Sequence, residues 1–168
     1  MLKYNFPTQK RLGDLAESMV ENALNKNFEI KKESSLHYQK KGIDFDLILP
    51  QSCGKYTIEV KLDTYSETNG RFFLEFLQTK RLGWVYTCTS DLLFLCQGLR
   101  GKIKITNPTV LRQNMNAWMS KYPIKTCHNV GGKWAKGVTT PIYTIPGVFV
   151  DINKSVISIE NIYKALNN

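Results

Sequence analysis

The sequence predicts an α/β domain in which a mixed central β-sheet is flanked by helices. Two segments between residues 42 and 61 alternate apolar and polar side chains, as the strands of a half-buried hairpin do. Residues 83–89 and 92–96 are apolar runs that suit buried central strands, and residues 8–25 carry apolar side chains at helical spacing. With 168 residues, 42% of them hydrophobic, the chain can bury one core, so we expect a single domain over residues 1–168.

The N-terminal part is expected to contain a helix, a strand and a loop. Pro7 and Thr8 can open a helix that runs to about Asn25, with Glu17 beside its apolar stripe. From the helix pattern alone, Glu17 is an ordinary surface acid. A first strand at residues 28–32 and a basic, mobile loop at residues 34–42 follow.

The predicted hairpin carries the most informative side chains of the sequence. Because side chains alternate between the two faces of a strand, Asp44 and Asp46 lie on the same face of the first strand. The same rule places Glu59, Lys61 and Asp63 together on the second strand. Acids from both strands and one lysine therefore arrive on one face of the hairpin.

The pairing of the two strands depends on the turn between them. If residues 51–54 form the turn, Asp46 lies opposite Glu59 and Asp44 lies opposite Lys61. Directly paired residues have Cβ atoms about 5 Å apart, so two facing carboxylates can share one divalent cation. Without a cation they would repel each other, and the arrangement therefore suggests a metal site.

The rest of the chain adds strands, two helices and a basic loop. Asn107 and Pro108 favour a helix start, because Asn caps well and Pro fits the first turn. The loop contains several glycines, with lysines and a tryptophan between them, and it can either grip a phosphodiester backbone or form ordinary surface. The expected elements are a strand at 72–77 with Arg71 and Glu75 on one face, a strand at 102–105, a helix from 107 to about 122, the loop at 125–146 and a helix at 158–166.

The charge of the chain favours a polyanionic partner. Lys and Arg number 23 against 14 Asp and Glu, which gives a formal charge of +9. Cations that neutralise phosphates release condensed counterions, so a basic protein gains affinity for nucleic acid. The residues expected to contact nucleic acid are Lys40, Lys41, Arg71, Lys125, Lys133, Trp134 and Lys136.

The cysteines and the N-terminal segment argue against a zinc-binding, secreted or membrane protein. Cys53, Cys88, Cys96 and Cys127 form no C-x-x-C pair, which argues against a structural zinc site, and Cys88 and Cys96 lie in apolar runs typical of a core. Residues 1–7 have no apolar signal-peptide core, and no apolar run approaches membrane-spanning length. We therefore expect an intracellular, cytoplasmic protein with reduced cysteines and no membrane association.

The hairpin motif resembles that of a known enzyme family. Asp46 followed by Glu59-Val60-Lys61 is similar to the D…(D/E)-x-K core of the PD-(D/E)XK nucleases, which have the restriction-endonuclease-like fold. Glu17 in Gly13-Asp-Leu-Ala-Glu resembles that superfamily's first-helix glutamate, and residues 63–75 resemble the continuation in small phage-type members. The resemblance covers residues 10 to about 97 as a catalytic core, and residues 98–168 are then a C-terminal elaboration. The chain departs from the pattern because Phe45, not proline, precedes Asp46, and Asp44 is a second candidate for the first acid.

The resemblance implies roles for individual residues. Asp46, Glu59, the main-chain carbonyl of Val60 and Glu17 would hold Mg²⁺, for which Mn²⁺ can substitute. Lys61 would orient or deprotonate the attacking water, or stabilise the transition state through its charge. Catalysis would then rest on Asp46, Glu59, Lys61 and Glu17, with Asp44, Asp63 and Glu75 as accessory acids.

The expected function is therefore metal-dependent hydrolysis of DNA phosphodiester bonds. An endonuclease of phage or mobile-element origin is the first hypothesis, with DNA as partner and a homodimer allowed. The alternatives are a nuclease specific for Holliday junctions or flaps, a DNA-binding protein with a degenerate site, and a nuclease that acts on RNA.

Overall fold

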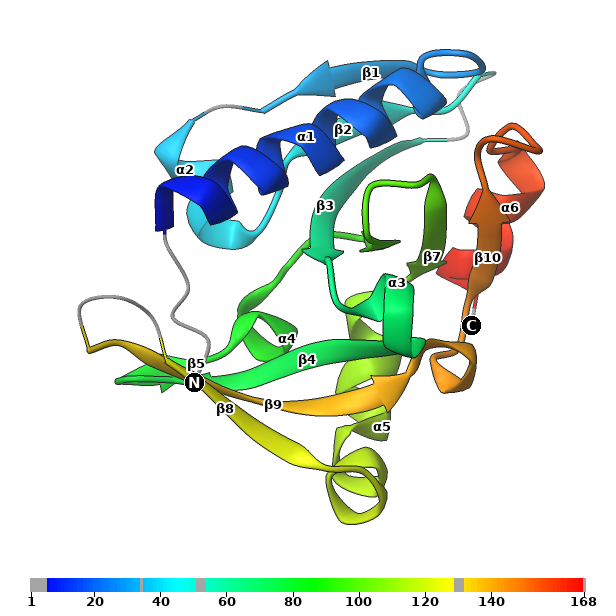
Figure 1. Ribbon diagram of the computed structural model, residues 1–168. Coiled ribbons are helices and arrows are strands. Elements are labelled where there is room, and N and C mark those ends of the chain that lie inside the picture. The colour runs from blue at the N-terminus through cyan, green and yellow to red at the C-terminus, as the bar shows by residue number, and fades with distance from the viewer. Residues whose placement is uncertain (1–5, 34, 51–53, 129–131, 168) are drawn as a thin grey trace.

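The structure, a computed structural model, describes residues 6–33, 35–50, 54–128 and 132–167 (Figure 1). Its helices are α1 (Phe6–Leu24), α2 (Leu36–Lys41), α3 (Ser66–Asn69), α4 (Trp84–Thr87), α5 (Pro108–Lys121) and α6 (Ile159–Leu166), with a 3-10 turn η1 (Ile142–Thr144). Its strands are β1 (Glu29–Lys32), β2 (Phe45–Ile48), β3 (Lys55–Asp63), β4 (Arg71–Gln78), β5 (Arg81–Leu82), β6 (Leu92–Gln97), β7 (Lys102–Thr106), β8 (Ile124–His128), β9 (Trp134–Pro141) and β10 (Val148–Asp151).

The described strands form two sheets. The larger sheet has the order β1-β2-β3-β6-β7-β10, and the smaller has the order β5-β4-β9-β8. In the larger sheet β3 and β6 are parallel, whereas the other neighbouring strands are antiparallel. The expected mixed central sheet flanked by helices is therefore confirmed. The second sheet was not expected, and through β9 and β10 the C-terminal part of the chain joins both sheets.

Each face of the larger sheet is covered by a different layer (Figure 1). On one face, the apolar side chains of β2, β3 and β6 pack against the stripe of α1 formed by Ala16, Val20 and Ala23, and against α6. On the other face, Leu93 and Leu95 of β6 pack against the smaller sheet and against α4 and α5. Because side chains alternate along β2 and β3, successive residues face opposite layers. Among the described helices, none combines the length and the apolar character that a transmembrane segment requires.

Two short segments differ from the expected elements. Residues 83–89 were expected to be a buried strand, but they contain α4, which Gly83 precedes as N-cap. The amide of Gly83 donates to Phe76 O, and the chain turns there because only glycine can lie so close to the backbone of Glu75. Residues 34–42 were expected to be a loop, but they contain α2, capped by the side chain of Ser35 and ended by Gly42 at φ +66°.

The basic loop expected at 125–146 is mostly a β-hairpin. Strands β8 and β9 pair with each other, and β9 pairs with β4 over most of its length. The glycines in this segment suggested a loop, but Gly137 leaves room for the ring of Phe73 on the neighbouring strand. Long-range pairing with β4 therefore outweighs the local loop signal, and residues 129–131 lie outside the described part of the chain.

The register of the β2–β3 hairpin differs by two residues from the expected one. Phe45 pairs with Ile58 and Ile48 pairs with Lys55, so Asp46 lies opposite Thr57 and not opposite Glu59. Pro50 has no amide hydrogen to donate, so pairing does not extend to that position as the four-residue turn required. The face assignment survives, because an even shift keeps every side chain on its side. The turn residues 51–53 lie outside the described residues.

Asp63 organises the end of β3. Its Oδ1 accepts hydrogen bonds from the amides of Tyr65 at 2.9 Å and Ser66 at 3.1 Å, and its Oδ2 accepts one from the amide of Phe73 at 2.8 Å. The carboxylate thus ties the turn into α3 to the beginning of β4. Burial raises the pKa of Asp63 despite these three bonds, so its contacts support a structural role for this accessory acid.

Replacing Asp63 with alanine is expected to destabilise the fold by roughly 2 kcal/mol, because three backbone amides lose their acceptor. Urea unfolding followed by circular dichroism measures the difference. Asp14→Ala, on the exposed surface of α1, is the matched control and is expected to stay within about 0.5 kcal/mol of the parent. Equal stabilities for the two variants would show that Asp63 does not hold the β3–β4 connection.

Candidate active site

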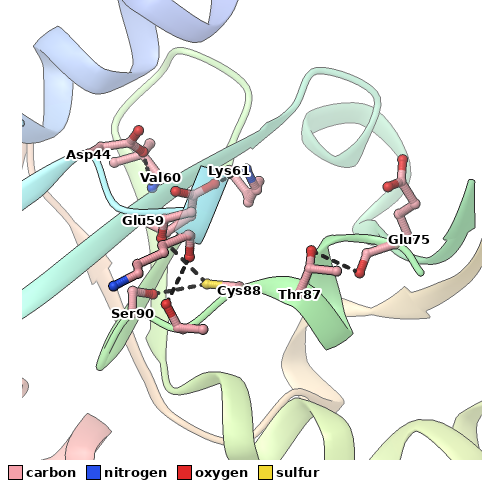
Figure 2. Close-up of polar contacts among 12 residues, drawn as sticks. Asp44, Glu59, Val60, Lys61, Glu75, Thr87, Cys88 and Ser90 are labelled. Carbon is pink, nitrogen blue, oxygen red and sulfur yellow. Dashed lines mark hydrogen bonds and ion pairs between the residues drawn. The ribbon is translucent and has the colours of Figure 1, made fainter. Parts of the chain in front are cut away.

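The observed register brings Asp44, Glu59 and Lys61 together where the chain enters β2 (Figure 2). The amide of Asp44 donates to Ile58 O at 2.7 Å, and Asp44 Oδ2 accepts a hydrogen bond from the amide of Val60 at 2.7 Å. Glu59 and Lys61 flank Val60 on β3, and their side chains form an ion pair. Glu59 and Lys61 are thus fixed on a strand, and Asp44, which precedes β2, is held against that strand by two hydrogen bonds.

Glu59 is held in a small polar recess. The residue is 5% exposed, and its carboxylate lies against Gly42, where a Cβ atom would be 3.3 Å from both Glu59 Cδ and Oε2. The same hypothetical atom would be 3.4 Å from Cys88 Sγ, which itself contacts Ser90 Oγ at 3.1 Å. Gly42 therefore serves both as the left-handed cap of α2 and as the space beside the carboxylate. Figure 2 shows Cys88 and Ser90 next to Glu59.

The Glu59 carboxylate raises the energy of the charged form of Asp44. Burial, followed by the negative charge of Glu59, raises the pKa of Asp44 to about 7, although the Val60 amide and Lys61 act in the opposite direction. Burial lowers the pKa of Lys61, but the adjacent Glu59 carboxylate outweighs it, and the pKa of Lys61 lies above its ordinary value. One lysine thus neutralises Glu59 and leaves Asp44 short of a cation.

Asp46, the acid expected to be the first metal ligand, lies outside this group. It pairs with Thr57, is 1% exposed and forms an ion pair with Lys55 at 2.6 Å between Oδ2 and Nζ. Neither of its oxygens has a hydrogen bond of ordinary geometry within the described residues, so Lys55 is its main compensating contact. Asp44, expected to be accessory, occupies the position beside Glu59 because the register is displaced by two residues.

Glu17 and Val60 are also placed by the structure. Glu17 on α1 forms an ion pair with Lys32 at 3.0 Å, and its charge contributes to the raised pKa of Asp44. It therefore lies in the neighbourhood of Asp44 but is already paired. At Val60 the contact within the site runs through the amide, which donates to Asp44.

The resemblance implies a divalent metal at this site. Among the described residues, no group of three or more His, Cys, Asp or Glu side chains converges on a point where a metal could bind. Asp44 and Glu59 supply two carboxylates, and burial, followed by the charge of Glu59, disfavours the charged form of Asp44. Mg²⁺ keeps several waters and commonly binds through one or two carboxylates together with substrate phosphates. The pair therefore fits Mg²⁺ better than a metal that needs a complete protein cage.

A cleft of about 610 Å³ begins beside Lys61. It lies between the C-terminal end of β3 and the smaller sheet, and its lining includes Arg71 and Glu75 from β4, Trp84 from α4 and Lys125 from β8. Lys61 Nζ lies 5.9 Å from the centre of the Trp84 ring. Figure 2 shows Glu75 well apart from the two carboxylates, and its side chain contacts Gln78. Glu75 is therefore a residue of the cleft and not of the carboxylate pair.

The basic residues expected to contact nucleic acid lie in three separate places. Arg71 and Lys125 line the cleft, whereas Lys40 and Lys41 are exposed at the end of α2. Lys133, Trp134 and Lys136 belong to the β8–β9 hairpin, and Trp134 is half-buried, with its backbone bonded to Thr79 Oγ1. Trp134 is thus a strand residue and not the tip of a loop.

Three residues near the site were missed by sequence reasoning. Gly42, Cys88 and Trp84 contact or border Glu59 and Lys61, yet each reads locally as part of a loop or a buried strand. Gly42 had a usable signal, because glycine after a lysine pair is typical of a helix C-cap. Cys88 and Trp84 had none, since their position depends on how α4 packs against β4 and α5.

Comparisons with known proteins give no relative for this chain. No family model, no curated protein and no solved structure matches it.

Asp44→Asn is expected to stabilise the metal-free protein at pH 8. Since the folded state raises the pKa of Asp44 from 3.8 to about 7, it binds a proton more tightly than the unfolded chain. The free energy of unfolding should therefore fall as the pH rises from about 4 to about 7. Asparagine keeps an acceptor for the Val60 amide without the charge, and the gain at pH 8 should be on the order of 4 kcal/mol.

Thermal and urea unfolding in EDTA at pH 4, 6 and 8 measures this effect. The difference between Asp44→Asn and the parent should vanish near pH 4, where both side chains are neutral. Asp14→Asn, an exposed acid on α1, is the control that should show no such trend. A variant that is less stable than the parent at pH 8 would contradict the unfavourable carboxylate pair.

Proposed function

We propose that this protein hydrolyses DNA phosphodiester bonds with a divalent metal ion, Mg²⁺ or Mn²⁺, held by Asp44 and Glu59. The observation that carries the proposal is the placement of these two carboxylates and Lys61 around Val60, at the junction of β2 and β3. An ordinary salt bridge between Glu59 and Lys61 does not require a second acid, Asp44, whose charged form Glu59 destabilises. A carboxylate with a raised pKa, such as Asp44, close to a cation that lines a cleft, such as Lys61, is typical of functional sites.

The residues of the site match the requirements of phosphodiester hydrolysis. Bound between the carboxylates, the metal would lower the pKa of a coordinated water and neutralise charge on the phosphate. Lys61 is a cation next to both acids, and it can orient the attacking water or neutralise negative charge on the phosphate in the transition state. Asp44 is oriented by the Val60 amide, and Glu59 by Lys61, so neither side chain has to be ordered when substrate binds.

The charge of the chain supports nucleic acid as substrate. The formal charge is +9, although the site itself is acidic, and Arg71 and Lys125 line the adjoining cleft. An acidic metal site beside cationic walls suits a polyanionic substrate, because the walls bind phosphates without competing for the metal. The mixed sheet, with β6 parallel to β3, is compatible with the restriction-endonuclease-like fold, which we include in the proposal.

Two other functions are compatible with the same observations. A structure-specific nuclease is favoured by the cleft, whose volume suits an unpaired strand better than a duplex. A DNA-binding protein without activity would explain the cations, but it gives no reason for an unfavourable carboxylate pair to be kept together with Lys61.

Asp44→Asn, Glu59→Gln and Lys61→Met should each lower Mg²⁺-dependent cleavage by at least about a hundredfold. Each change removes a metal ligand or a cation at the phosphate, and every 1.36 kcal/mol of lost stabilisation is about tenfold in rate. Closed circular, linear duplex, single-stranded and four-way-junction DNA, with an RNA strand, are incubated in parallel with each variant. Cutting of closed circles establishes endonuclease action.

Asp46→Asn is the matched control, because it changes the same residue type two positions along the strand. It should cleave within about fivefold of the parent once circular dichroism confirms its fold, since Asp46 faces Lys55 and not Glu59. An inactive Asp46 variant beside an active Asp44 variant would reverse the assignment. Undiminished cleavage by Glu59→Gln and Lys61→Met would place the active site elsewhere.

A further inference from the structure

We propose that the cleft beside Lys61 binds an unpaired DNA strand and delivers it to the carboxylate pair, which makes single-stranded or branched DNA the substrate class. This inference rests on the proposed nuclease function for its mechanism, but the binding it describes can be measured without cleavage. It is carried by the lining of the cleft, its size and its position next to Lys61.

The lining combines aromatic rings with cations. Tyr65, Phe73 and Trp84 contribute ring surface, and Arg71 and Lys125 contribute positive charge. Proteins that bind single strands stack bases on aromatic side chains and follow the backbone with cations, and base-paired DNA does not offer its base faces for such stacking. This combination of side chains therefore fits an unpaired strand.

The aromatic surface is held in place before any ligand binds. The ring of Phe73 packs over Gly137, where a side chain would collide with it, and Trp84 lies at the start of α4 under Lys61. Tyr65 is 44% exposed and follows Asp63, whose carboxylate holds the Tyr65 amide. Preformed stacking surfaces reduce the entropy lost on binding.

The two acids of the cleft, Asp63 and Glu75, accept hydrogen bonds from neutral donors and form no ion pair with its cations within the described residues. Asp63 is occupied by three backbone amides, and Glu75 contacts the side chain of Gln78. Lys125 is exposed and belongs to no ion pair within the described part of the chain, although its charge does act on Asp63. Its ammonium group is thus accessible to a phosphate.

The dimensions of the cleft favour one strand over two. Its volume of about 610 Å³ is in the range of pockets that enclose small molecules, which corresponds to one or two nucleotides and not to a base-paired helix. Because Lys61 lines the cleft and is also paired with Glu59, a strand that lies in the cleft passes beside the carboxylates.

The β8–β9 hairpin supplies a matched control. Lys125 pairs with Gly137, and Thr126 pairs with Lys136, so Lys125 and Lys136 project from opposite faces of the same sheet. Both lysines are exposed, but only Lys125 belongs to the cleft lining. Replacing each in turn separates a contact in the cleft from a general loss of positive charge.

The test is fluorescence anisotropy of a labelled oligothymidylate of about 12 nucleotides, with full-length protein in EDTA. A duplex of equal length and an oligouridylate serve as competitors. The parent should bind the single DNA strand at least about tenfold more tightly than the duplex. Lys125→Ala should weaken this binding several-fold and lower the salt slope by about 0.7, whereas Lys136→Ala should change it less than twofold. Trp84→Leu should weaken it about tenfold through lost stacking.

Equal or tighter binding of the duplex would overturn the proposal, as would equal losses for Lys125→Ala and Lys136→Ala. Tighter binding of oligouridylate would show that RNA, and not DNA, is the ligand of the cleft. Mg²⁺-dependent cleavage is followed in parallel to separate the two proposals. If the protein binds the single strand through Lys125 but cleaves no substrate, the strand-binding proposal holds and the nuclease proposal is refuted. If it cleaves DNA in a manner that depends on Asp44 but shows no preference for single strands, the nuclease proposal holds and the strand-binding proposal is refuted.

Discussion

The contact between Asp44 and the Val60 amide fixes the geometry on which the site depends. It keeps one carboxylate beside another that is 5% exposed, in spite of their mutual repulsion. Antiparallel pairing of β2 with β3, the cap at Gly42 and the ion pair of Glu59 with Lys61 all support this arrangement. The rest of the fold stabilises two strands whose junction is itself unfavourable, which is a common property of functional sites.

The smaller sheet forms one wall of the cleft that leads to this junction. The face of β3 that carries Glu59 and Lys61 is the one opposite α1, and β4, β9 and β8 lie over it with α4 between (Figure 1). Their packing leaves the cleft open at the C-terminal end of β3. The buried contacts of Leu93 and Leu95 therefore position the cleft wall as well as the core.

The sequence predicts the local parts of this arrangement well. Helices α1, α5 and α6 and strands β3, β6 and β7 follow from periodicity and caps, and the shared face of Asp44, Glu59 and Lys61 follows from parity. The residue opposite Glu59 cannot be predicted in this way, because a register shift of two residues leaves every side chain on the same face. It depends on the length of the turn, which the sequence does not determine. The β8–β9 hairpin and α4 are not predicted from the sequence either. The hairpin depends on long-range pairing with β4, and α4 depends on the close approach of Gly83 to the backbone of Glu75.

The central claim is that Asp44 and Glu59 hold one divalent cation. Isothermal titration calorimetry of metal-free protein with Mn²⁺ at neutral pH tests it without any substrate. We expect one binding site in the parent and in Asp46→Asn, and a loss of affinity of at least about tenfold in Asp44→Asn and in Glu59→Gln. Binding that survives in Asp44→Asn but disappears in Asp46→Asn, or a parent protein that binds no metal, would contradict the account.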